Sequence, residues 1–186
     1  MAIMVGFALS GRGEGESGFA ELFPGGLIDG EGNPVSLDVL EGKAVGVYFS
    51  AHWCAPCRHF TPRLVAYRDT HKDDFEVVFV SADRSEKKQF EYMKSAGMEW
   101  PAVQFDSAAT KALKEKFAIQ GYPTLVMLNA QGVPLTSDGR SYVNQGDPAA
   151  KLKTATVVKE SFKCGKCDKT HHRSKMVFED AVATAD

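Results

Sequence analysis

The sequence predicts an α/β fold in which a mixed central sheet is flanked by helices. Residues 44–49, 75–81 and 122–128 are short apolar runs of the kind that fill the interior of a sheet. Residues 57–68 and 109–117 instead carry apolar side chains at three- and four-residue spacing, which indicates helices. The order strand, helix, strand over residues 44–81 implies a right-handed parallel crossover.

Shorter elements are expected between these segments. In chain order they are a turn or short helix at 19–22, a hairpin at 25–33, a short element at 35–40, an extended segment at 100–105 and a hairpin completed over 133–143. Asp83 or Ser85 can cap a further helix, in which Phe90 and Met93 face inward and which ends at Gly97.

Length and composition predict one domain with extensions. A chain of 186 residues with 44% hydrophobic residues can bury a core of its own. Residues 1–24 are expected to form a flexible N-terminal extension, because their second half is rich in glycine and charge. Residues 25–150 form the predicted domain. Residues 151–186 form a basic tail that contains cysteine and histidine and is expected to be mobile.

Charge and cysteine content narrow the class of protein. A net charge of -2 gives no indication of nucleic acid binding, and no apolar run approaches the roughly 18 residues that a membrane span needs. Four cysteines occur as two C-x-x-C pairs, which indicates thiol or metal chemistry in a reducing compartment. No secretory signal is expected at the N-terminus. We expect a monomer in the cytoplasm, with the nucleus as the alternative.

Cys54 and Cys57 lie where a buried strand gives way to a helix. Unpaired N–H groups and the helix dipole favour a thiolate at that end, so Cys54 is expected to attack a disulfide. Cys57, one turn into the helix, is expected to resolve the mixed disulfide. Pro56 stiffens the ring without cost to the helix, and Trp53 forms a flat lid. The alternative is half of a zinc site, which is disfavoured because no second ligand pair has zinc-ribbon spacing.

Several motifs in the same order resemble the tryparedoxin and nucleoredoxin group of thioredoxin-fold proteins. They are Y-F-S-A-H-W-C-A-P-C-R at 48–58, F-T-P-R-L at 60–64, F-V-S-A-D-R-S-E at 79–86, G-Y-P-T-L at 121–125 and T-S-D-G-R at 136–140. The resemblance spans roughly residues 27–148 and implies a thioredoxin-like three-layer fold. It also implies that Trp53, Cys54 and Cys57 form the active site. A cis bond before Pro123 would let the backbone of Tyr122 pair with an extended substrate.

The resemblance implies a protein-disulfide reductase that requires no bound cofactor. Protein disulfides, peroxiredoxin-like ones among them, would be its substrates. Thioredoxin reductase, glutathione or a trypanothione-type thiol would supply the electrons. The alternative function is a nucleoredoxin-like module that binds a partner in a redox-dependent way and turns over rarely.

Two positions near the cysteines depart from the related families. Thioredoxins carry a buried acid that would fall at Tyr48, so Cys57 must pass its proton to water or another group. Ala55 replaces the glycine or proline usual before Pro56, and this dipeptide tunes the redox potential within the fold.

Charged residues around the motif are expected to set specificity. Tryparedoxins carry an acidic residue where Arg84 stands, whereas Arg140 matches a substrate-side arginine of that family. Two positive charges favour protein substrates over a polyamine thiol. Arg58 raises the local positive potential, which favours a thiolate or an acidic partner, although a solvated helix face is an equal alternative. His52 and His59 flank the motif and are interpreted mainly as surface residues.

The second C-x-x-C pair lies in the predicted tail. Cys164 and Cys167 are followed by His171 and His172, which are zinc-ligand types at a spacing shorter than that of a folded finger. Three interpretations stay open: a metal site, a second redox pair, and a mobile basic tail with incidental thiols. The last is preferred.

Overall fold

The structure is a computed structural model that describes residues 18–163 and 170–177. Within those residues no helix has the length and apolar character needed to cross a membrane. The main sheet has the strand order β4-β3-β5-β6. These strands span Ala44–Ser50 for β3, Phe75–Ser81 for β4, Thr124–Leu128 for β5 and Pro134–Thr136 for β6.

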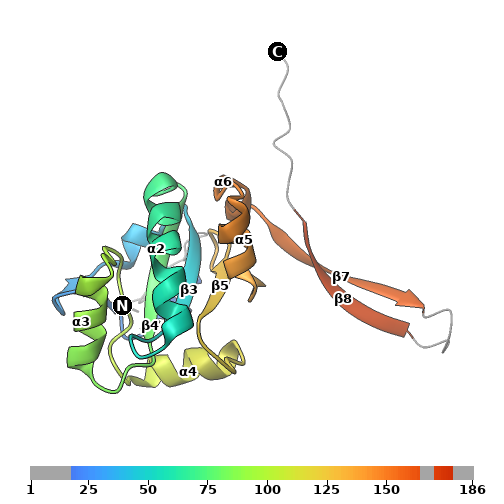
Figure 1. Ribbon diagram of the computed structural model, residues 1–186. Coiled ribbons are helices and arrows are strands. Elements are labelled where there is room, and N and C mark those ends of the chain that lie inside the picture. Colours follow the sequence, from blue (N-terminus) through green and yellow to red (C-terminus); the bar gives the residue numbers. More distant parts are fainter. Residues whose placement is uncertain (1–17, 164–169, 178–186) are drawn as a thin grey trace, which may run out of the picture.

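Strand β3 is central and fully buried. It pairs parallel with β4, with Ala44 opposite Phe75 and Ser50 opposite Ser81, and antiparallel with β5. The chain between β3 and β4 is helix α2, Ala55–Thr70 (Figure 1). The predicted mixed sheet with a parallel crossover is therefore confirmed.

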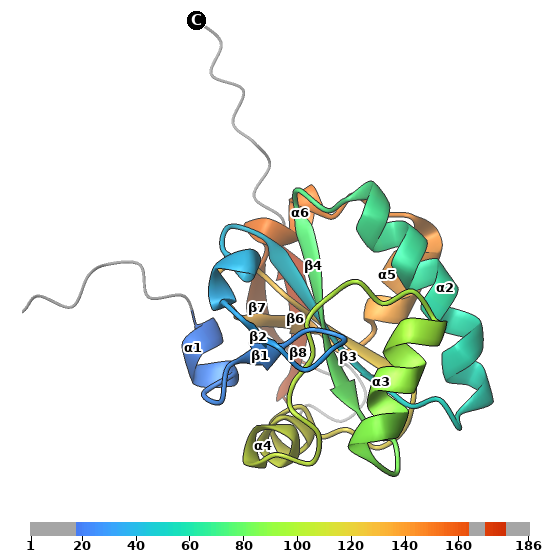
Figure 2. The same cartoon turned by 90° about the vertical axis from the view of Figure 1, so that its left-hand side faces the viewer.

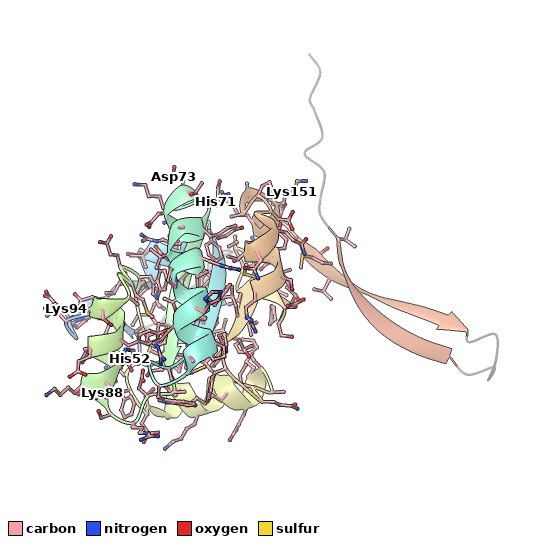
Figure 3. All side chains as sticks on the ribbon, viewed as in Figure 1. His52, His71, Asp73, Lys88, Lys94 and Lys151 are labelled. Atoms are coloured by element: carbon pink, nitrogen blue, oxygen red, sulfur yellow. The ribbon has the colours of Figure 1, made fainter. Side chains whose placement is uncertain are left out.

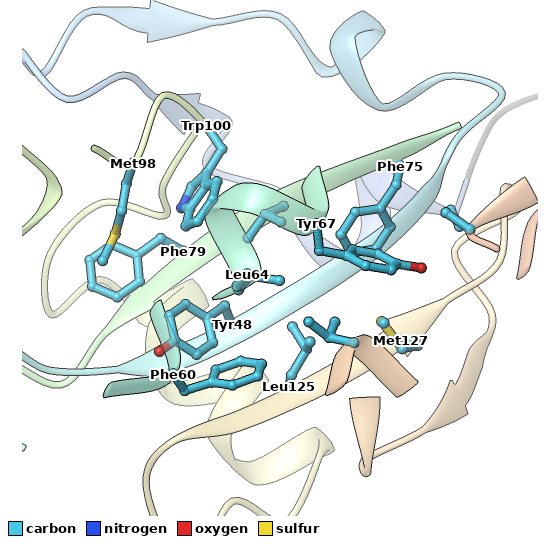
Figure 4. Close-up of a cluster of buried hydrophobic side chains, with 14 of the residues drawn as sticks. Tyr48, Phe60, Leu64, Tyr67, Phe75, Phe79, Met98, Trp100, Leu125 and Met127 are labelled. Carbon is cyan, nitrogen blue, oxygen red and sulfur yellow. The ribbon is translucent and has the colours of Figure 1, made fainter. Parts of the chain in front are cut away.

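Helices cover both faces of the sheet, which gives three layers (Figure 2). One face packs against α2, α3 (Glu86–Ser95), α5 (Gly139–Gln145) and α6 (Ala150–Lys153). The other packs against α1 (Phe19–Leu22), the 3-10 helix η1 (Leu37–Leu40) and α4 (Ala108–Lys116). Because side chains alternate along a strand, Tyr48 of β3 enters the first core and Val47 the second. Figure 4 shows the first core around Tyr48, Phe60 and Leu64.

The segment 133–143 was expected to complete a hairpin. Strand β6 does pair antiparallel with β5, but the expectation is wrong after residue 136. Only Pro134–Thr136 is extended, and α5 begins at Gly139. A Cβ atom at Gly139 would lie 2.8 Å from the carbonyl oxygen of Leu125, so glycine lets α5 start directly against β5. A helix of seven residues contains too few turns to give a clear apolar period.

The N-terminal hairpin is present, but the domain begins earlier than predicted. Strands β1, Leu27–Ile28, and β2, Pro34–Val35, pair antiparallel around a tight turn. Phe19 and Leu22 of α1 are buried in the second core, so the predicted boundary at residue 24 is too late. The rest of the predicted extension, residues 1–17, lies outside the described residues.

The segment after residue 150 contains regular structure where a mobile tail was expected. Leu152 of α6 is buried in the first core. Strands β7, Thr156–Lys163, and β8, Thr170–Val177, form an antiparallel pair that extends from the domain (Figure 1). Basic composition is no obstacle to such a pair, because the ladder satisfies backbone groups whatever the side chains are.

Candidate active site

Cys54 is the N-cap residue of α2, as the sequence predicted. Its backbone N–H donates to the carbonyl of Ala51, and its carbonyl accepts from the N–H of Arg58. The side chain is only 7% exposed, whereas Trp53 beside it is 52% exposed. Trp53 is held by a hydrogen bond from its indole N–H to the carbonyl of Ala82, 2.9 Å away. The exposed indole therefore marks the entrance to a mostly covered thiol.

Cys57 lies one turn into the helix and is completely buried. Burial raises the pKa of this thiol to about 11, the neighbouring Cys54 side chain adds to the rise, and a hydrogen bond with Ser50 opposes it. Cys57 is therefore a neutral thiol at physiological pH until a base removes its proton. Cys54 is the more exposed of the two thiols.

The bond between Tyr122 and Pro123 is cis, as the resemblance implied. It places the carbonyl of Tyr122 3.6 Å from the Cys54 sulfur, which donates a hydrogen bond to it. The Tyr122 ring meets the Trp53 ring edge to face, with 6.1 Å between centroids. An extended chain that paired with this backbone segment would run directly beside the Cys54 sulfur.

Four buried hydroxyl groups lie beneath Cys57. Thr61 donates to the Cys57 carbonyl at 2.9 Å, and its oxygen lies 2.9 Å from the Tyr48 hydroxyl and 2.6 Å from the Tyr92 hydroxyl. Ser50 donates to the Tyr48 hydroxyl at 3.0 Å. Burial raises the pKa of Tyr48 far above its usual value, so this phenol can pass protons along but does not carry charge. Sequence reasoning identified Tyr48 as the substituted position but missed its three partners.

Arginines hold the loops on both sides of the motif. Arg58 donates to the carbonyl of His52. Arg140 donates to the carbonyl of Pro123 at 3.4 Å and lies over the ring of Phe60, 5.5 Å from its centroid. Both arginines were predicted to lie at this site, and both donate to backbone carbonyls of the loops beside the cysteines.

Asp83 supports the loop that leads into Cys54. One carboxylate oxygen accepts from the backbone N–H of His52 at 2.8 Å, and the other accepts from the Ser81 hydroxyl at 2.9 Å. Burial raises the pKa of this carboxyl. Of the two predicted helix caps, Ser85 is the N-cap of α3, and Asp83 instead anchors the active-site loop.

We expect Asp83→Ala to destabilise the fold by about 1–3 kcal/mol, because the partly buried N–H of His52 would lose its acceptor. Urea unfolding with intrinsic fluorescence would measure this loss. Asp83→Asn keeps a carbonyl oxygen for His52 and serves as the matched control, with an expected loss of less than half that of Asp83→Ala. Equal losses in the two variants would contradict the role assigned to this hydrogen bond.

Arg84 and His52 line a cavity beside the active site. The cavity has a volume of about 380 Å³, and its other lining residues are Trp53, Asp83, Ser85 and Lys88. Arg84 thus stands beside the exposed indole, where the sequence placed a specificity residue. Ala55 and Pro56 form the first turn of α2, between the two cysteines.

The predicted metal candidates are not brought together in the described part of the chain. Cys164 and Cys167 lie outside the described residues, and His171 and His172 lie in β8. Residues 18–163 and 170–177 contain no cluster of three or more potential metal-ligating side chains. Cys54 and Cys57 are both free thiols.

A dithiol at a helix N-terminus, opposite a cis-proline loop on a sheet of order β4-β3-β5-β6, defines a protein of the thioredoxin class. A family model described as thioredoxin-like matches residues 42–133. The chain belongs to the thioredoxin-like family, within the group that contains the nucleoredoxins and tryparedoxins.

Relatives of known sequence and structure support this placement. Human nucleoredoxin is 45% identical over 130 residues, which cover 68% of this chain and 29% of the relative. Tryparedoxin II from C. fasciculata has a TM-score of 0.64 and 36% identity, with 72% of this chain and 90% of that chain covered. Thioredoxin from Wuchereria bancrofti has a TM-score of 0.59 and 39% identity, with coverages of 64% and 85%. The chain spans less than a third of the length of human nucleoredoxin.

Proposed function

We propose that this protein reduces protein disulfides by thiol–disulfide exchange through Cys54 and Cys57. The observation that carries the proposal is the position of the Cys54 sulfur, 3.6 Å from the carbonyl of Tyr122 in the cis-proline loop. That loop offers backbone groups to an extended chain, so a substrate cysteine can be delivered to Cys54 with little side-chain complementarity. Backbone recognition of this kind suits an enzyme with several protein substrates.

The reaction has two exchange steps. The Cys54 thiolate attacks one sulfur of the substrate disulfide, which forms a mixed disulfide and releases the first substrate thiolate. Cys57 then loses its proton and attacks the Cys54 sulfur, which releases the second substrate thiolate and leaves a disulfide between Cys54 and Cys57. The released thiolates take up protons, and the protein has given two electrons to the substrate.

Cys57 needs a proton acceptor in the second step. The hydroxyl groups of Ser50, Tyr48 and Thr61 form the hydrogen-bonded path closest to this residue. Because their pKa values keep such hydroxyls neutral, they are relays, and the departing substrate thiolate or water is the final acceptor. In this protein the hydroxyl groups would therefore carry out the proton transfer from Cys57 that a buried acid carries out in thioredoxins.

A reductant must return the protein to its dithiol form. Thioredoxin reductase, glutathione and a trypanothione-type thiol are the proposed donors, and peroxiredoxin-like proteins are among the proposed substrates. We place the protein in a reducing compartment, the cytoplasm or the nucleus, because a protein that acts as a dithiol must be kept reduced.

Insulin reduction with dithiothreitol tests the proposal. The full chain is expected to accelerate the appearance of insulin B-chain turbidity, and Cys54→Ser is expected to lose this activity entirely. Cys57→Ser is expected to accumulate mixed disulfides with many proteins, because the resolving thiol is absent. No acceleration by the full chain would overturn the proposal. A single stoichiometric partner that Cys54→Ser still retains would instead favour a redox-dependent binding module.

A further inference from the structure

Three arginines, Arg58, Arg84 and Arg140, lie at the candidate active site, and a fourth, Arg63, lies further along α2; none of the four makes an ion pair within residues 18–163 and 170–177. We call Arg58, Arg63, Arg84 and Arg140 the cationic rim. Three of them contact neutral groups instead: Arg58 donates to the His52 carbonyl, Arg63 to the Asn144 side-chain oxygen and Arg140 to the Pro123 carbonyl. Their charges are therefore held in place but left uncompensated.

The rest of α2 makes this distribution unusual. From Ala55 to Arg68 the helix contains no acidic residue, and its first carboxylate is Asp69 in the last turn. At that far end Arg68 pairs with both Asp69 and Glu76. The chain as a whole carries a net charge of -2, so the positive charge at the active-site end of α2 does not reflect a basic protein overall.

The sheet order places the rim on both sides of the cysteines. Arg84 follows β4, Cys54 follows β3, Pro123 precedes β5 and Arg140 lies just after β6. Because β4 is parallel to β3, β5 is antiparallel to it and β6 is antiparallel to β5, these four points share one edge of the sheet. A polypeptide that pairs with the cis-proline loop therefore has Arg84 on one side of Cys54 and Arg140 on the other.

The carboxylates of Asp83, Glu91 and Asp138 are engaged with partners other than the rim. Asp83 is buried, and its two oxygens accept from His52 and Ser81. Glu91 is 2.6 Å from the ammonium group of Lys88 and 4.0 Å from that of Lys87. The Asp138 carboxylate accepts from the Ser141 hydroxyl.

On the basis of the proposed function, we propose that the cationic rim selects disulfides set in acidic polypeptide segments, with carboxylates on both sides of the attacked cysteine. The cavity whose lining includes Arg84, Lys88 and His52, and in which Asp83 is buried and hydrogen-bonded, would receive an acidic side chain from one side of the disulfide. Arg140 would face the other side. Attraction between such charges raises the rate of encounter more than it raises the final affinity.

Three synthetic peptide disulfides of equal length test this inference, with acidic, neutral or basic residues around the cysteines. Stopped-flow experiments with the reduced full chain would give a second-order rate constant for each peptide. Each constant is divided by the rate constant for reduction of the same peptide by dithiothreitol. This division corrects for the effect of the flanking charges on the reactivity of the disulfide itself. The normalised constant is expected to be about tenfold higher for the acidic than for the basic peptide at low salt. This ratio is expected to fall steeply at about 0.5 M salt.

Two charge-reversal variants distinguish the effect of the cationic rim on this ratio from the effect of the protein's net charge. Arg84→Glu is expected to reduce the acidic-to-basic ratio by about threefold or more. Lys151→Glu changes the net charge equally, but it lies in α6 at the opposite end of the sheet from His52 and Lys88 (Figure 3), so the ratio should be retained.

The outcomes distinguish this inference from the proposed function. Equal normalised constants for the three peptides, or the same reduction of the ratio by both variants, would overturn the inference alone. Failure to reduce any peptide, the neutral one included, would overturn the proposed function and the inference with it.

Discussion

In a Cys54→Ser protein, the Cys57 thiol is expected to react with iodoacetamide slowly at pH 7, and its rate should still rise at a pH where an ordinary cysteine has levelled off. The reason is that burial, the largest cause of the raised Cys57 pKa, is retained in this variant, although the contribution of the Cys54 side chain is lost. At pH 7 the fraction of molecules that carry the thiolate should therefore be well below the few per cent expected for an ordinary cysteine of pKa about 8.5. Peptide mass spectrometry after timed quenching would report Cys57 separately from Cys164 and Cys167.

The matched control is a short unfolded peptide that spans residues 52–62 with serine at position 54. Its rate should level off near pH 9, whereas that of the folded protein should still rise. A plateau below pH 9 in the folded protein would contradict the prediction. The same pKa difference makes the stability of the reduced protein depend on pH. The Cys57 thiol ionises at a lower pH in the unfolded chain than in the folded protein, so the reduced protein should lose stability as the pH rises from about 8.5 towards 11.

Much of the fold could be predicted because its strands are buried on both faces. Strands β3 and β4 are apolar along nearly their whole length, and runs of that kind stand out in a sequence. Helix α5 was missed because a short helix that starts at a glycine has the composition of a turn. The pair β7 and β8 was missed because its polar composition resembles that of a solvated tail.

The candidate site likewise contains residues that could be predicted from the sequence and residues that could not. Cys54, Cys57, Trp53 and Pro123 are recognisable from local motifs, because their chemistry depends on spacing and on the strand-to-helix junction. The hydroxyl cluster depends on contacts between distant residues: Tyr92 comes from α3 and meets Thr61 of α2 across 31 positions of sequence. No local pattern contains that information. Asp83 was similarly interpreted, together with Ser85, as a possible helix cap, because aspartate is a preferred residue at the N-cap position.

The ion pair between Arg68 and Glu76 is expected to be the most sensitive polar contact in the fold. Two parallel hydrogen bonds of 2.9 Å join the guanidinium to the carboxylate, whose side chain is only 5% exposed. The pair connects the last turns of α2 to β4 and so fixes the helix that carries both cysteines. Glu76→Leu would leave a largely buried guanidinium without its main counter-charge, and we expect a loss of about 3–5 kcal/mol in the free energy of unfolding.

A double-mutant cycle separates the missing charge from the missing contact. Arg68→Met alone leaves the buried carboxylate of Glu76 unpaired and should also be strongly destabilising. The double variant, Arg68→Met with Glu76→Leu, removes both charges, so it should recover most of the stability lost in either single variant. Urea unfolding of the four proteins at one pH would give the coupling energy. Additive losses in the double variant would contradict this account. Each single variant leaves one unpaired charge and the double variant leaves none, so additive losses would mean that the two side chains contribute mainly through packing.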